Sequence, residues 1–220
     1  GTMPPDGNAV ELHDLRFAYD ARTVLALDHY ALRAGGQATV IGPSGCGKTT
    51  FVHLLAGLLS PDHGQVRVLG QDMTALSESQ RDRFRGRHIG FVFQQLHLMP
   101  ALTVRQNLEL AQRLAGDAAT ARRIDDLLTR LGLTDFANRR PDALSHGQAQ
   151  RVAIARALVH APELVIADEP TSALDDANAE SVLELLVASA EAAGAALMVV
   201  THDRRVRGRL SSELSLGSAP

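Results

Sequence analysis

The sequence is poor in cysteine and contains no long apolar run. Its only cysteine, Cys46, has no second thiol in the chain with which to form a disulfide, which fits a reducing compartment. No uninterrupted apolar stretch approaches the roughly 20 residues that a membrane-spanning helix requires. The opening residues GTMPPDGN also lack the apolar segment of a signal peptide. We therefore expect a cytosolic protein that neither spans a membrane nor is exported by its own N-terminus.

The chain also lacks an excess of positive charge. It has 22 Lys and Arg residues against 25 Asp and Glu residues, and its formal net charge of -3 gives no overall field that would attract a nucleic acid or an anionic membrane surface. By contrast, 45% of its 220 residues are hydrophobic, which is enough for the core of one compact domain. We expect residues 8–220 to form that domain and exclude residues 1–2 as a cloning remnant.

Apolar patterning predicts an α/β fold. Strands are expected where apolar residues alternate or form short runs, in VELHDLRFAY, LDHYALRA, QATVI, GQVRVLG and HIGFVF. A helix is expected over residues 49–59, and the middle of the chain, about 102–133, is predicted to be helical. The runs ELVIA and ALMVV predict two buried parallel strands, joined by a crossover helix over about 177–193.

The segment GPSGCGKTT, residues 42–50, matches the phosphate-binding pattern G-x-x-x-x-G-K-[ST], the P-loop or Walker A motif. Gly42, Gly45 and Gly47 allow a tight turn whose N–H groups face phosphate oxygens. Lys48 adds a positive charge near the β and γ phosphates, and Thr49 offers a hydroxyl to Mg²⁺. A Gly-rich turn with an incidental lysine is the alternative. The predicted strand before the segment and the predicted helix after it favour the phosphate-binding loop.

Two adjacent carboxylates, Asp168 and Glu169, follow the predicted strand LVIA. The carboxyl ends of parallel strands are where open α/β sheets bind their ligands. Asp168 suits the coordination shell of Mg²⁺, and Glu169 can orient and polarise a water beside the γ-phosphate. A solvated turn would be the ordinary interpretation of such a pair, but the phosphate-binding loop favours a catalytic one.

Four further features carry less specific signals. His202 in THD follows a predicted strand and could be either catalytic or a surface residue. Gln94 in FVFQQ also follows a strand, and it could reach Mg²⁺ or water or simply cap a loop. Tyr19 could stack on a nucleotide base or be an ordinary strand aromatic. In LSHGQ, Ser145 could be a common helix N-cap, or the helix start could bind an anion.

In this order and at these separations, the phosphate-binding loop, Gln94, LSHGQ, ADEP, SALD and His202 resemble the nucleotide-binding subunit of ATP-binding cassette (ABC) transporters. The resemblance covers nearly the whole chain, and LSHGQ is its most specific element because many other ATPases share the phosphate-binding loop. It implies a P-loop NTPase core with a mostly parallel sheet, an N-terminal antiparallel β subdomain, and a helical subdomain inserted at about residues 95–160.

The resemblance also implies the site residues. Glu169 would be the general base, His202 would hold the γ-phosphate, and Lys48 would bind the phosphates of ATP. Three residues would ligate Mg²⁺: Thr49, Gln94 and Asp168. The nucleotide contacts would be Tyr19 on the adenine, the loop residues Gly42, Pro43, Ser44, Gly45, Cys46, Gly47, Lys48, Thr49 and Thr50, Gln94, and, across a dimer interface, Ser145, Gly147 and Gln148. Residues 172–175 would couple the two sites. The chain departs from the family at His146, which is usually glycine, so we expect slower hydrolysis at most.

The stretch from LSESQ to NLEL resembles the lipoprotein-release and macrolide-efflux group of the family. We therefore expect an ATP-hydrolysing subunit that forms an ATP-dependent homodimer on the inner face of the cell membrane. It would drive a transmembrane permease in export or lipoprotein extraction. The permease contact would lie in residues 94–114, with Leu96, Leu98, Met99 and Leu102 as candidates.

Two other functions compete with transport. A soluble ABC-type ATPase acting on nucleic acid or ribosomes would be expected to carry coiled coils, zinc ligands, a second cassette or a basic patch, and the sequence displays none of them. We therefore expect no nucleic-acid partner. A P-loop kinase would have an acceptor pocket where this chain has the LSHGQ helix.

Overall fold

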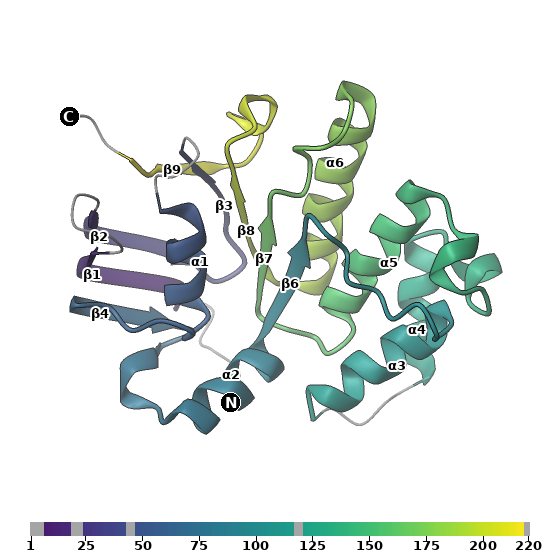
Figure 1. Cartoon of the computed structure of the whole chain (residues 1–220), viewed down its shortest axis with the longest axis horizontal. Coiled ribbons are helices and arrows are strands. Elements are labelled where there is room, and N and C mark those ends of the chain that lie inside the picture. Colours follow the sequence, from purple (N-terminus) through teal and green to yellow (C-terminus); the bar gives the residue numbers. More distant parts are fainter. Residues whose placement is uncertain (1–6, 19–23, 43–46, 117–120, 218–220) are drawn as a thin grey trace.

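The computed structural model describes residues 7–18, 24–42, 47–116 and 121–217. At its centre is a parallel sheet, and different groups of elements cover its two sides (Figure 1). The helices α3 (Val104–Leu114), α4 (Ala121–Arg130) and α5 (His146–Leu158) gather on one side. An antiparallel sheet and α1 (Lys48–Leu55) lie on the other. This arrangement confirms the predicted α/β class.

The central sheet has the order β6-β7-β8-β3-β9, and all its described pairings are parallel. Its strands are β3 (Gln37–Ile41), β6 (Ile89–Phe93), β7 (Leu164–Asp168), β8 (Ala196–Thr201) and β9 (Ser212–Ser215). The predicted crossover helix between β7 and β8 is α6 (Asp176–Ala193). The sequence did not suggest β9, whose four residues are mostly exposed.

The second sheet has the order β2-β1-β4-β5. It is built from β1 (Asn8–Ala18), β2 (Val24–Arg33), β4 (His63–Val68) and the two-residue β5 (Gln71–Asp72). All its pairings are antiparallel, which confirms the predicted N-terminal antiparallel subdomain.

Side chains of the two central strands alternate between the two faces of the parallel sheet. One set packs with helices α3 to α6: Val165, Ala167, Leu197 and Val199. The other set packs with α1 and the antiparallel sheet: Leu164, Ile166, Met198 and Val200. Each of these eight residues is at most 2% exposed. Because both faces are buried, the strands read in the sequence as continuous apolar runs instead of alternating ones.

Helix α1 ends earlier than expected. The apolar pattern predicted a helix to residue 59, but the helix stops at Leu55. Gly57 adopts a left-handed φ of 75° and donates to Leu54 O, while Leu58 N donates back to His53 O. These two bonds form the Schellman motif that commonly ends helices at a glycine. As a result Leu58 is 55% exposed.

The sequence predicted some of the remaining helices and missed another. Helices α3 and α4 lie within the predicted helical middle of the chain, whereas α2 (Glu78–His88) was not predicted. The described residues also form short 3-10 turns, namely η1 (Met73–Ala75), η2 (Thr134–Phe136), η3 (Pro141–Ala143) and η4 (Arg204–Val206). Within the described part of the chain, no helix has both the length and the apolar character needed to cross a bilayer.

Helix α5 packs closely against β6. A Cβ added to Gly90 of β6 would lie 2.1 Å from the carbonyl oxygen of Ala157, so only glycine permits this approach. The contact fixes the C-terminal end of α5 relative to the sheet. The expected extent of the helical subdomain, about 95–160, encloses α3, α4 and α5 and stays a prediction.

Candidate active site

The carboxyl ends of four adjacent strands meet at one edge of the parallel sheet. Ile41 of β3 pairs with Thr201 of β8, Val200 of β8 pairs with Asp168 of β7, and Asp168 pairs with Phe93 of β6. This is the edge at which open parallel sheets bind their ligands. The four residues that directly follow these strands are Gly42, Gln94, Glu169 and His202.

The phosphate-binding loop runs from β3 into α1. Gly47 has a φ of 95° at the N-cap of α1, a conformation that glycine adopts without strain. Lys48 is buried, and its Nζ donates a 2.6 Å hydrogen bond to Gly42 O, which joins the two ends of the loop. Thr49 is exposed and Thr50 is half-buried at the start of the helix. The predicted contacts Tyr19, Pro43, Ser44, Gly45 and Cys46 lie outside the described residues.

Asp168 is a half-buried carboxylate at the end of β7. Burial raises its pKa above the ordinary value and the charge of Glu169 raises it further, while His53 and Lys48 act in the opposite direction. No hydrogen bond to this carboxylate is found among the described residues. A carboxylate in this condition is suited to binding a cation.

Glu169 is held by four hydrogen bonds. Its Oε2 accepts from the hydroxyls of Thr201, at 2.7 Å, and Ser172, at 3.0 Å. Its Oε1 accepts from the backbone N–H of His202 at 3.1 Å and lies 2.6 Å from the Nδ1 of the same residue. Although burial by itself raises the pKa of Glu169, these bonds outweigh it and hold the pKa below the ordinary value.

The backbone places Glu169 in this cage. Its φ of 51° is unusual for a residue with a Cβ, and its N–H donates a 2.8 Å hydrogen bond to Val200 O of the neighbouring strand. The chain therefore turns sharply after Asp168, and the two adjacent carboxylates have different surroundings. Residues held in such conformations cluster at active sites.

The contact with Glu169 determines which ring nitrogen of His202 carries a proton. The lowered pKa of Glu169 keeps its carboxylate ionised near neutral pH, and an ionised carboxylate only accepts hydrogen bonds. The Nδ1 of His202 therefore carries the proton in the 2.6 Å contact. The Nε2 is left for a ligand, and the side chain is 49% exposed.

The loop between β7 and α6 is tied to this site from one side. Ser172 contributes one of the four bonds to Glu169. At the other end of the loop, Asp175 caps α6 by accepting a 2.9 Å hydrogen bond from Asn178 N.

The predicted Mg²⁺ ligand Gln94 directly follows β6, and it is exposed.

The LSHGQ turn forms the start of α5, on the side of the helical elements (Figure 1). Ser145 Oγ accepts a 3.1 Å hydrogen bond from Gln148 N, and the Gln148 side chain accepts a 2.9 Å bond from Ser145 N. This capping box realises the helix N-cap that was one interpretation of the sequence. His146 and Gly147 are exposed, and a Cβ on Gly147 would meet nothing within 4 Å. Ser145 and Gln148 therefore cap the helix while the turn stays open.

Comparison with known proteins decides the family. The family model described as ABC transporter matches residues 28–172, about two thirds of the chain. The chain belongs to the ABC transporter family. It is an ATP-binding and ATP-hydrolysing subunit of an ABC transporter, as the resemblance in the sequence implied.

Three relatives illustrate this membership. A lipoprotein-releasing system ATP-binding protein LolD from Idiomarina loihiensis is 41% identical over 87% of this chain and 85% of its own length. A macrolide export ATP-binding/permease protein MacB from Rhodopseudomonas palustris is 38% identical over 96% of this chain, which corresponds to 33% of that larger protein. The dimeric ATP-binding cassette MJ0796, in a post-hydrolysis state bound to ADP and Pi, is 34% identical with a TM-score of 0.77 over 94% of each chain.

Sequence reasoning missed some residues that contact the candidate site. It quoted THD but gave no role to Thr201, whose hydroxyl contacts Glu169, or to Asp203, which accepts a 2.7 Å bond from the Thr171 hydroxyl. It also overlooked Arg205. The motifs ADEP and THD place polar residues at two adjacent strand ends, and this placement was the available signal that they touch.

Proposed function

We propose that Lys48, Glu169 and His202 carry out the ATPase reaction of this ABC subunit. The observation that carries the proposal is the cage of four hydrogen bonds around Glu169, at the strand ends where Gly42 and Lys48 also lie. An ionised carboxylate held in one position can orient and polarise the attacking water, and Lys48 supplies positive charge to the phosphates. His202 would hold the γ-phosphate through Nε2, because Nδ1 is occupied by Glu169.

Thr49, Gln94 and Asp168 are the proposed ligands of Mg²⁺. A hydroxyl, an amide oxygen and a carboxylate are the oxygen donors that Mg²⁺ prefers. The half-buried Asp168, which has no donor among the described residues, supports the assignment. Bound Mg²⁺ would neutralise charge on the β and γ phosphates. Residues 42–50 and Tyr19 are the further proposed contacts to ATP.

The second half of each site is proposed to come from another copy of this chain. The capping box occupies the N–H groups of Ser145 and Gln148, and Ala149 N donates to Ser145 O. The N–H groups of His146 and Gly147 remain for an anion at the positive end of the helix dipole. Because the turn is open and on the side of the helical elements, it suits a nucleotide held by a partner. The chain carries both halves of the site, which supports an ATP-dependent homodimer.

Residues 94–114 are the proposed contact to the transmembrane permease. The side chain of Asn107, which is 2% exposed, accepts a hydrogen bond from Met99 N and donates to three carbonyls of the loop. Arg156 of α5 donates to the carbonyls of Leu96 and His97. Asn107 and Arg156 thus hold the backbone of the loop, whereas the Met99 side chain is 48% exposed. A rigid loop with an exposed apolar side chain supports contact with a partner protein.

The proposed subgroup is that of lipoprotein release and macrolide efflux. Its support is the identity of about 40% to relatives named for these systems, one of which carries its ATP-binding and permease parts in a single protein. The proposed location is the cytoplasmic face of the cell membrane, where a separate permease would hold the chain. No observation favours the alternative action on nucleic acid or ribosomes.

The roles in the site can be tested by comparing Glu169→Gln with Glu184→Gln. Glu184 is exposed on α6 and provides a matched control with the same chemical change. We expect Glu169→Gln to lower the kcat for phosphate release by about 100-fold or more, because the water loses its base. The variant should still bind ATP, and a stalled dimer should accumulate with Mg²⁺ and ATP in size-exclusion chromatography. Normal turnover in Glu169→Gln would remove Glu169 from its assigned role.

A further inference from the structure

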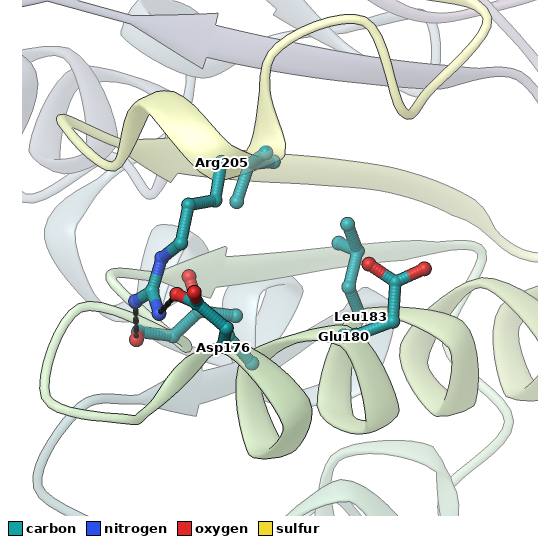
Figure 2. A pocket seen from close by; sticks show the side chains of 7 residues that line it. Asp176, Glu180, Leu183 and Arg205 are labelled. Carbon is teal, nitrogen blue, oxygen red and sulfur yellow. Dashed lines mark hydrogen bonds and ion pairs between the residues drawn. The ribbon is translucent and has the colours of Figure 1, made fainter.

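Arg205, in the turn η4 after β8, has an acceptor for every N–H of its guanidinium. Figure 2 shows the guanidinium reaching Asp176 at the start of α6. Its Nε lies 3.0 Å and its Nη2 lies 2.8 Å from the two carboxylate oxygens of Asp203. Its Nη1 donates to Leu174 O and to Asp176 Oδ1, both at 2.9 Å. Its Nη2 also donates to Thr171 O at 3.0 Å. A lysine has one nitrogen and cannot match this planar fork of five donors.

These bonds join two loops that are far apart in the sequence. Thr171 and Leu174 belong to the loop between β7 and α6, and Asp176 begins α6. Asp203 and Arg205 belong to the turn that follows His202. Arg205 therefore ties the 171–175 loop and the first residue of α6 to the turn that follows His202.

The same network reaches Glu169. Asp203 accepts a 2.7 Å hydrogen bond from the Thr171 hydroxyl, and its own N–H donates to Thr201 Oγ1 at 2.9 Å. Thr201 Oγ1 in turn donates to Glu169 at 2.7 Å. A continuous chain of hydrogen bonds thus links Arg205 to the proposed base through Asp203 and Thr201.

Hydrogen bonds hold Arg205 more than packing does. A small cavity of about 170 Å³ lies beside it, lined also by Glu180 and Leu183 of α6. The Arg205 side chain is 35% exposed, whereas that of Asp203 is only 8% exposed. An exposed ion pair contributes little, but a bidentate guanidinium that also binds two backbone carbonyls defines a geometry.

We infer that Arg205 is a positioning residue for ATP hydrolysis, which holds the 171–175 loop in register with Glu169 and His202. This inference rests on the proposed roles of Glu169, His202 and residues 172–175. If those residues couple two sites across a dimer, losing the clamp loosens both the base and the coupling. ATP binding at residues 42–50 is untouched, because Arg205 contacts none of its described residues.

The test compares Arg205→Ala, Arg205→Lys and the control Arg204→Ala in the full chain. Arg204 is the exposed neighbour in the same turn, and its side chain makes no hydrogen bond or ion pair with the described residues. We expect Arg205→Ala to lower kcat about tenfold, to change the KM for ATP less than about twofold, and to bring the Hill coefficient for ATP towards one. Hydrogen exchange in the 171–178 segment should accelerate. Arg204→Ala should match the wild type.

Arg205→Lys separates a loss of positioning from a loss of folding. It keeps the charge, so we expect a thermal midpoint close to that of the wild type together with a lowered kcat and faster exchange in the 171–178 segment. Folded Arg205 variants with wild-type kcat, Hill coefficient and exchange would overturn the inference, as would kcat falling only in step with the thermal midpoint. Glu169→Gln measured in parallel separates the two ideas, because normal turnover there refutes the proposed site itself.

Discussion

The hydroxyl of Thr201 donates a 2.7 Å hydrogen bond to Oε2 of Glu169 from the strand next to it. Thr201 is fully buried, and its Oγ1 also accepts from Asp203 N, so the hydroxyl is fixed in one orientation. Glu169 thus receives one of its four bonds from a side chain that the fold holds rigidly. The position of the carboxylate therefore depends on β8 as much as on its own strand.

Replacing this hydroxyl should slow hydrolysis. We expect Thr201→Val to lower kcat about five- to tenfold, because a hydrogen bond to a charged group contributes about 1.5 kcal/mol and tenfold in rate corresponds to about 1.4 kcal/mol. The KM for ATP should stay nearly constant, and Thr201→Ser should restore most of the rate. Steady-state phosphate release measures both quantities.

Thr39 provides the matched control for this change. It is buried in the neighbouring strand β3, and its hydroxyl has no hydrogen-bond partner among the residues that the structure describes. Thr39→Val should therefore leave kcat unchanged and keep or slightly raise the free energy of unfolding. Equal kinetic effects of the two substitutions would mean that the Thr201 hydroxyl acts only on stability.

Because the LSHGQ turn is open, we expect a substitution at Gly147 to leave the stability of the monomer unchanged and to weaken the dimer. A Cβ on Gly147 meets no atom of the chain within 4 Å, so Gly147→Ala should leave the thermal midpoint unchanged or raise it. If this turn binds a partner's nucleotide, the added methyl should still weaken the ATP-dependent dimer of a Glu169→Gln background. Analytical ultracentrifugation with Mg²⁺ and ATP measures the dimer fraction.

Gly86 of α2 is the control for Gly147. It is also a helical glycine whose Cβ would meet nothing within 4 Å. Gly86→Ala should stabilise the chain by about 0.5–1 kcal/mol and leave the dimer intact. A dimer fraction for Gly147→Ala equal to that of Gly86→Ala would contradict the placement of the turn at a second nucleotide. At His146, substitution by glycine should raise turnover at most about fivefold, since one hydrogen bond contributes about 1 kcal/mol or less and tenfold in rate corresponds to about 1.4 kcal/mol.

The carboxylate of Asp203 should contribute to stability in a defined pH range. The hydrogen bonds from Arg205, chiefly, and from Thr171 lower its pKa to about 2, against the effect of its burial, and Asp176 is the other acid that faces Arg205. A lowered folded-state pKa contributes stability that is fully present above the unfolded value near 4 and is lost as the pH falls towards 2. Its contribution at pH 7 is about 1–2 kcal/mol.

Urea denaturation from pH 2 to pH 7 tests this contribution. Asp203→Asn should be less stable than the wild type at pH 7, and the difference should shrink below pH 4. Asp126→Asn, a change of an exposed residue on α4, should produce no pH-dependent difference. A constant difference across the whole range would show that the Asp203 charge does not stabilise the fold.

The sequence predicted elements that have apolar patterns and missed those that do not. Helix α2 contains no buried residue, so no apolar periodicity could reveal it. Its Ser77 and Gln80 form a capping box, and this S-x-x-Q pattern was the one local signal of its start. The early end of α1 was likewise encoded in Gly57, while the apolar pattern continued beyond it.

The same distinction applies to the site. Motifs predicted Lys48, Asp168, Glu169 and His202 as candidate site residues because such chemistry requires fixed spacing along the chain. Arg205 escaped notice because, apart from the nearby Asp203, its acceptors belong to residues about 30 positions away, Thr171, Leu174 and Asp176. Only the sheet register brings these two parts of the chain together. Contacts between loops at adjacent strand ends leave no periodic pattern in a sequence.

Met99 offers the sharpest test of the proposed permease contact. It is 48% exposed on the loop held by Asn107 and Arg156, while Leu58 is 55% exposed after α1. Affinity-tagged Met99→Asp and Leu58→Asp can be purified from detergent-solubilised host membranes with Mg²⁺ and ATP. We expect a polytopic membrane protein to copurify with the wild type and with Leu58→Asp, and to be depleted at least about fivefold with Met99→Asp, because a charge buried in an apolar interface is costly. The ATPase rate of isolated Met99→Asp should equal that of the wild type. Equal recovery of the membrane protein with both variants would place the permease on another surface.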